Sequence, residues 1–239
     1  MSETTEINIA EIKAKLYEKL KSSQWGDKLK GFLLSTDFDK IIKYLQDEVQ
    51  EDRRFTPPLR DMFKAFTECP YKDLKVIFLL QDPYPALGVA SGLAMCCENT
   101  GILQPSLKYV YQQVHETVYK NEPYEYNPSL KHWANQGVLL LNTALTTTVG
   151  KTGTHYDIWK PFMVYLLDIL SSYNPGLIYV YFGKVSQEWM DFTLDNNHKI
   201  IVSHPASAAY AKAKTWDSQG LFPKINEILL RTNNLQIKW

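Results

Sequence analysis

Residues 74–84 read LKVIFLLQDPY, and this stretch decides the fold. Residues 74–80 are apolar apart from Lys75 and rich in branched and aromatic side chains, as in strands buried on both faces. Three further runs of this kind occupy residues 137–141, 177–182 and 199–202. Near-continuous apolar runs of this length are typical of a parallel sheet with helices on both faces.

Segments with helical periodicity alternate with these runs. They occupy residues 105–119, 157–170, 185–192 and 219–230, while residues 8–20, 37–50 and 58–67 precede the first run and are expected to cover one side of the sheet. The alternation predicts an α/β fold with a central four-stranded, mostly parallel sheet flanked by helices. No repeat or low-complexity linker divides the chain, so we expect one domain over residues 1–239, with residues 1–24 as a helical N-terminal extension.

The charges balance: 26 Lys and Arg against 26 Asp and Glu give a net charge of zero. No global positive field therefore indicates nucleic acid, and DNA binding would have to depend on a local patch. Cys69, Cys96 and Cys97 lack metal-ligand spacing, which favours a reducing, intracellular setting, cytoplasmic or nuclear. No apolar run is long enough to span a bilayer, so we expect no membrane association. We also expect the protein to be a monomer.

Chemically useful side chains follow each of the four apolar runs. Gln81-Asp82-Pro83-Tyr84 follows the first run, Asn142 the second, Gly183-Lys184 the third and His204 the fourth. In open α/β sheets ligands bind beyond the carboxyl ends of the strands. A carboxylate, a carboxamide and an imidazole are therefore expected at one edge of the sheet, which is an active-site layout.

These segments resemble motifs of the family 1 uracil-DNA glycosylases. QDPY at residues 81–84, QGVLLLN at 136–142 and an HPxS loop at 204–207 occur in the family's order. Weaker matches are Ser91-Gly92-Leu93, Pro105-Ser106-Leu107, Trp133 and Trp159. The resemblance extends from about Trp25 to the last residue, and the ordered set is far more specific than any one motif.

The resemblance implies that Asp82 and His204 are the catalytic residues. Breaking a glycosidic bond builds positive charge on the sugar and negative charge on the base, so a site needs an anion and a hydrogen-bond donor. Asp82 would position the attacking water and stabilise the sugar cation, and a neutral His204 would donate to the uracil oxygen. The alternatives are a turn-forming aspartate and a core histidine. We expect His155, beside Thr154 in another family-like segment, to be structural.

Four residues are expected to bind the base. The Asn142 amide can pair with N3–H and O4 of uracil, and Tyr84, by the resemblance, would exclude the thymine methyl. Gln81 would act through its backbone. Met95 stands where the family stacks a phenylalanine on the base, and it either covers the base or packs in the core. Strand-end capping for Asn142 and core packing for Tyr84 are the alternatives.

DNA contacts are expected from the loops at the same edge. The candidates are Pro105, Ser106, Gly183, Lys184, Ser207, Ala208 and Lys212, with Lys214 nearby. The chain departs from the family pattern at Leu80, Pro85, Met95 and Ala208, where glycine, histidine, phenylalanine and an intercalating leucine are usual. Either Tyr210 or no side chain would fill the gap left by a flipped base.

The resulting hypothesis is a monofunctional uracil-DNA glycosylase that needs no cofactor or metal and leaves an abasic site in DNA. A protein inhibitor of such enzymes is a further possible partner. Two alternatives stay open: a DNA-binding or processivity protein with weakened catalysis, and a glycosylase for a modified pyrimidine.

Overall fold

The computed structural model describes residues 8–120 and 122–239 and contains the predicted central sheet. Its four strands are all parallel, in the order β3-β2-β5-β6. They are β2 (Val76–Leu80), β3 (Val138–Asn142), β5 (Ile178–Phe182) and β6 (His198–Val202). All residues of β2, β3 and β5 are buried, as expected of strands covered on both faces. In β6, an edge strand, only Ile200 and Val202 are buried, so the prediction that the fourth run is buried on both faces was wrong. The predicted α/β fold is therefore confirmed.

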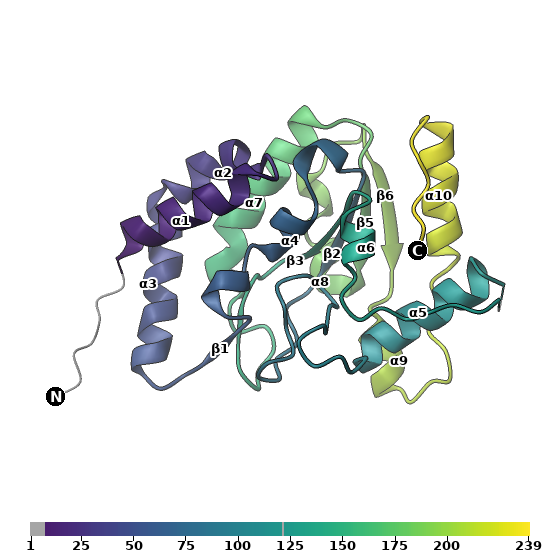
Figure 1. Ribbon diagram of the computed structural model, residues 1–239, viewed down its shortest axis with the longest axis horizontal. Coiled ribbons are helices and arrows are strands. Elements are labelled where there is room, and N and C mark those ends of the chain that lie inside the picture. The colour runs from purple at the N-terminus through teal and green to yellow at the C-terminus, as the bar shows by residue number, and fades with distance from the viewer. Residues whose placement is uncertain (1–7, 121) are drawn as a thin grey trace.

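Helices cover both faces of this sheet (Figure 1). On one side lie α1 (Ile9–Lys21), α2 (Trp25–Leu33), α3 (Thr36–Gln50) and α7 (Tyr156–Tyr173), while α10 (Leu221–Arg231) lies on the other. The remaining helices are α4 (Lys64–Glu68), α5 (Pro105–Thr117), α6 (Lys131–Ala134), α8 (Gly183–Gln187) and α9 (Pro205–Tyr210). Short 3-10 turns occupy Leu59–Asp61, Tyr71–Asp73 and Met190–Phe192.

Local sequence explains where several helices begin. The side chains of Asn8 and Ser35 accept backbone N–H groups at the starts of α1 and α3, at 3.2 and 3.3 Å. Pro105 and Pro205 occupy the first positions of α5 and α9, where a missing N–H costs nothing and the fixed φ suits a helix. His204 thereby becomes the N-cap of α9.

Several element predictions need correction. The helix predicted over residues 58–67 is a 3-10 turn followed by the five-residue α4, and residues 185–192 hold the end of α8 and the 3-10 turn Met190–Phe192. The prediction missed α2, α6 and α9. It also missed a small antiparallel sheet of β1 (Phe55–Thr56) and β4 (Thr147–Thr148).

A continuous apolar core joins the elements, from Leu20 in α1 to Trp239. Trp25, Trp133 and Trp159 are fully buried within it. This continuity supports the proposal of one domain; residues 1–7 of the proposed extension lie outside the described residues. The three cysteines are buried and free. Within the described ranges, no helix has both the length and the apolar character needed to cross a bilayer.

Candidate active site

A cavity of about 420 Å³ opens beyond the carboxyl ends of β2 and β3. It brings together eight of the predicted site residues: Gln81, Asp82, Tyr84, Met95, Pro105, Ser106, Asn142 and His204. Parallel strands end at one edge of a sheet, so segments distant in sequence meet there. Leu80, Pro85, Gln104, Thr152, Ala206, Ala209 and Tyr210 also line the cavity.

Asp82 enters the cavity two residues after the end of β2. Its Oδ2 accepts the backbone N–H of Gly153 at 2.7 Å. Burial raises the pKa of Asp82 to about 6, against the lowering effects of the Gly153 N–H and the Tyr156 hydroxyl. The carboxylate is therefore ionised at neutral pH but poorly solvated, which strengthens its attraction for a positive charge.

His204 is held as a neutral hydrogen-bond donor. Its Nδ1 accepts the backbone N–H of Ala206 at 3.1 Å, so Nδ1 carries no proton and the neutral ring must carry its proton on Nε2. Burial lowers the pKa of His204 to about 4. The position at the N-cap of α9 also disfavours a positive charge. The Nε2–H group is thus the available donor of this ring.

Gly183 packs directly behind His204. Its φ is +80°, and a Cβ atom there would come within 2.9 Å of the His204 Cβ. Both the left-handed backbone and the close approach require glycine. We predicted Gly183 as a DNA contact. Its geometry indicates that it also fixes the position of the His204 imidazole.

The register of the sheet places Asn142. This residue pairs with Leu80 across β3 and β2, so its side chain lies level with the start of the Gln81–Tyr84 segment. The segment is tied to β3 because Thr143 donates its N–H to the Leu80 carbonyl and its hydroxyl to the Gln81 carbonyl, both at 2.9 Å. The Asn142 carboxamide makes no hydrogen bond to the described residues and lines the cavity, so it is available to a ligand.

Tyr84 and Met95 form one wall. The Tyr84 hydroxyl donates to the Met95 carbonyl at 3.2 Å, which fixes the ring against the loop. Met95 has φ +62° and is 5% exposed, yet it lines the cavity. The sequence left open whether Met95 packs in the core or covers the base. In the structure its side chain belongs to both the core and the cavity wall.

The remaining predicted DNA contacts lie around the cavity. Lys184, Ser207 and Lys212 are exposed. Ser207 also donates its hydroxyl to the His204 carbonyl at 2.7 Å. Ala208 is 7% exposed, belongs to the core and, unlike the equally buried Ser106 and Asn142, does not line the cavity, so we withdraw it from the contacts.

Tyr210, on the same helix, is 86% exposed and lines the cavity. Sequence reasoning did not identify Gly153 or Tyr156. Neither belongs to a motif that we recognised, and both are distant from Asp82 in the sequence: Gly153 follows it by 71 residues.

Comparison with known proteins decides the family. The sequence pattern of the uracil DNA glycosylase superfamily matches residues 66–230. The chain belongs to this superfamily. It is 30% identical to the uracil-DNA glycosylase of Christiangramia forsetii and 32% identical to that of Buchnera aphidicola from Baizongia pistaciae, covering 90% of this chain and 96% of each relative.

Solved structures of the superfamily share the fold. The crystal structure of mimivirus uracil-DNA glycosylase matches with a TM-score of 0.79 at 23% identity, over 92% of this chain and 88% of that chain. A variant of mimivirus UNG in complex with UGI also matches with a TM-score of 0.79. The superfamily consists of hydrolases of N-glycosyl bonds, and this membership confirms the predicted enzyme class.

Proposed function

We propose that this glycosylase releases uracil from DNA with Asp82 and His204 as its catalytic residues, leaving an abasic site for base excision repair. The observation that carries the assignment is the His204 ring, whose Nδ1 accepts the Ala206 N–H at 3.1 Å and so leaves the proton on Nε2 of a ring that lines the same cavity as Asp82. A donor and a carboxylate in one cavity match the two charges of the transition state.

The two residues act on opposite ends of the breaking bond. As the bond lengthens, negative charge develops on the uracil and is stabilised by the Nε2–H of His204. The sugar becomes positive and is stabilised by Asp82, which also orients the attacking water. A neutral imidazole donates without requiring a proton from solvent, and the low pKa of His204, about 4, keeps it neutral at physiological pH.

Recognition of the base is assigned to the cavity walls. The free amide of Asn142 pairs with N3–H and O4 of uracil and would leave groups unpaired against cytosine. Tyr84 excludes a C5 methyl because its ring packs against the core and leaves no room for the extra carbon. Gln81 contributes backbone groups, and the Met95 thioether covers one face of the base.

The DNA backbone is assigned to groups around the cavity. At the start of α5 these are Pro105, which is exposed, and Ser106, which is 7% exposed but lines the cavity, while Lys184, Ser207 and Lys212 follow β5 and β6. Tyr210 takes the place that Ala208 leaves vacant and fills the gap in the duplex after the base has flipped. A monomer and sensitivity to a protein inhibitor are further parts of this proposal; the complex of mimivirus UNG with UGI supports the latter.

Single-turnover base release tests the proposal, with oligonucleotides carrying uracil, 5-hydroxymethyluracil or thymine. We expect wild-type protein to release uracil, and Asp82→Asn and His204→Asn to be slower by about 100-fold or more with DNA affinity retained. The His204→Asn change is preferable to alanine because asparagine preserves an N-cap acceptor for α9. Wild-type-like rates in both variants would refute the catalytic assignment. A preference for 5-hydroxymethyluracil would support a modified-pyrimidine glycosylase instead.

A further inference from the structure

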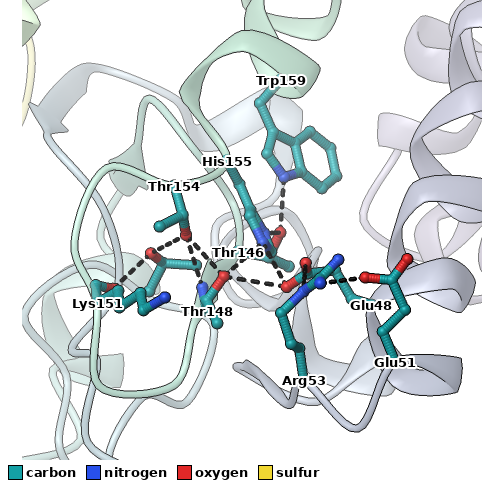
Figure 2. Close-up of polar contacts among 10 residues, drawn as sticks. Glu48, Glu51, Arg53, Thr146, Thr148, Lys151, Thr154, His155 and Trp159 are labelled. Carbon is teal, nitrogen blue, oxygen red and sulfur yellow. Dashed lines mark hydrogen bonds and ion pairs between the residues drawn. The ribbon is translucent and has the colours of Figure 1, made fainter.

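Residues 146–156, which contact Asp82 through Gly153, are hydrogen-bonded to a buried carboxylate that does not line the cavity. Glu48 on α3 is 3% exposed, and no step of the proposed reaction uses it. Its carboxylate accepts the Thr148 hydroxyl at 3.0 Å and lies 3.5 Å from Nε2 of His155 (Figure 2). Arg53 pairs with the same carboxylate and balances its charge. Burying a carboxylate costs free energy that its partners offset only in part, so the buried Glu48 indicates a specific role.

Two chains of hydrogen bonds converge on Glu48. In the first, Trp159 donates to the Thr146 hydroxyl at 2.8 Å, and this hydroxyl lies 2.8 Å from Nδ1 of His155, whose Nε2 faces the Glu48 carboxylate, a group that can only accept. The neutral ring then carries its proton on Nε2, facing Glu48; burial lowers the pKa of His155, which favours this neutral form.

In the second chain, the Thr154 hydroxyl donates to the Thr148 hydroxyl at 2.9 Å, and that hydroxyl donates to Glu48. Figure 2 shows both chains meeting at the carboxylate. Residues 146–156 are thereby fixed to α3 at both ends of the loop.

This fixed segment presents two groups to Asp82. The Gly153 N–H donates to Asp82 Oδ2 at 2.7 Å. The Tyr156 ring packs on Gly153, where a Cβ atom would come within 2.9 Å of the ring. The buried Tyr156 hydroxyl faces Gln81 and Asp82 but falls short of a well-formed hydrogen bond with the described residues. Such contacts in ligand-free sites commonly tighten when substrate binds.

We propose that residues 146–156 form a positioning arm for Asp82, with Gly153 and Tyr156 as its donors and the buried Glu48 as its anchor. This inference rests on the proposed function of Asp82. The arm holds the carboxylate in one orientation and keeps it ionised although it is largely removed from water. Loss of the arm would leave burial unopposed, and the carboxyl would take up a proton at a higher pH.

Other ionisable groups near the arm are accounted for. His204 lines the same cavity as Asp82, Glu188 faces Tyr156, and Tyr44 packs edge-on against His155 at 5.3 Å between ring centroids. Glu51 shares Arg53 with Glu48. These groups are unchanged in the variants below, apart from Glu51, which serves as a control.

The test compares Tyr156→Phe and Glu48→Gln with two matched controls. Tyr165→Phe removes a hydroxyl from the same helix, but that hydroxyl donates to the Lys28 carbonyl at 3.0 Å, away from the cavity. Glu51→Gln removes the other carboxylate that pairs with Arg53. Single-turnover uracil release is measured from pH 4.5 to 9. A ¹³C NMR titration follows the Asp82 carboxyl, assigned by its loss in Asp82→Asn.

We expect both arm variants to release uracil about 10- to 100-fold more slowly, with DNA affinity retained. Their acidic limb and the NMR titration of Asp82 should move to higher pH by about half a unit or more, since a donor to the carboxylate is lost or displaced. Both controls should resemble wild type. An unchanged Asp82 titration in Tyr156→Phe would overturn the proposal, whether or not Glu48→Gln folds. If wild-type protein released no uracil, the proposed function would fail, while the NMR titration would still decide whether the arm acts on Asp82.

Discussion

At the scale of single residues, the cavity keeps the Asp82 carboxyl ionised and the His204 imidazole neutral at the same pH. Asp82 and His204 are both half-buried, and burial moves the pKa of each toward its neutral form, to about 6 for the acid and about 4 for the base. The carboxyl is ionised above pH 6 and the imidazole is neutral above pH 4. Both active forms therefore coexist at neutral pH, and the falling rate on acidification should follow Asp82 rather than His204.

Gly183 provides a residue-scale test of how closely His204 must be placed. We expect Gly183→Ala to slow uracil release by about 10- to 100-fold, because the new Cβ pushes the imidazole out of its position. The control is Gly176→Ala, whose φ is also positive, at +86°, and whose Cβ would meet nothing within 4 Å. Both variants carry similar backbone strain, so the difference between their single-turnover rates isolates the contact with His204. Equal rates would show that the position of His204 tolerates the displacement.

Specificity at C5 is expected to reside in the ring of Tyr84. Tyr84→Ala should release thymine at a measurable rate and reduce the preference for uracil by about 10- to 200-fold, the range that one methyl group commonly contributes. Tyr84→Phe keeps the ring and removes the hydroxyl that donates to Met95, so it should still refuse thymine. Competition assays with paired uracil and thymine oligonucleotides check both variants. If Tyr84→Ala also refuses thymine, another group excludes the methyl.

At the scale of elements, the sequence predicted what short-range patterns encode. The four strands of the central sheet and α1, α3, α5, α7 and α10 carry long apolar patterns and were located correctly within a few residues. Helix α2 was missed because Gly26 and Gly31 lower its helical propensity and its N-cap, Gln24, has φ +64° with no side-chain cap. Strands β1 and β4 have two residues each and exist only through pairing with one another, which no local pattern reveals.

Helix α9 determines which side chain faces DNA. Its first turn buries Ala208, and its last residue, Tyr210, projects into solvent at the cavity. We expect Tyr210→Ala to weaken binding to abasic product DNA and to slow release from duplex more than from single strands, because only a duplex closes over the gap left by the base. Tyr210→Leu retains an apolar wedge and should restore most of the duplex rate. Equal losses on both substrates would contradict a wedge.

At the scale of the whole molecule, the site depends on contacts that cross the chain. The residues after the strand ends could be predicted because a parallel sheet always brings carboxyl ends together. The donors to Asp82 could not, since Gly153 and Tyr156 lie in a loop whose position depends on Glu48, more than a hundred residues earlier. Likewise, the burial of Ala208 follows from packing of α9 on the core, which the HPxS-type motif does not specify.

The charge balance of the whole molecule leads to a last prediction, on the salt dependence of DNA binding. Each neutralised phosphate contributes about −0.9 to the slope of log affinity against log salt concentration. With 26 positive and 26 negative side chains, no long-range field assists binding, and the few exposed groups around the cavity must supply the phosphate contacts. We therefore expect a shallow slope, of about −2 to −4.

Lys184→Ala and Lys212→Ala should each make this slope shallower by about 0.9, because each removes one phosphate contact near the cavity. Lys72 lies in the turn before β2, at the opposite edge of the sheet, so Lys72→Ala removes the same charge from the molecule without a contact. Fluorescence anisotropy with a uracil oligonucleotide from 50 to 300 mM salt measures all four slopes. If Lys72→Ala changed the slope and the other two did not, DNA would bind at the opposite edge, and the cavity could not be the site of base release.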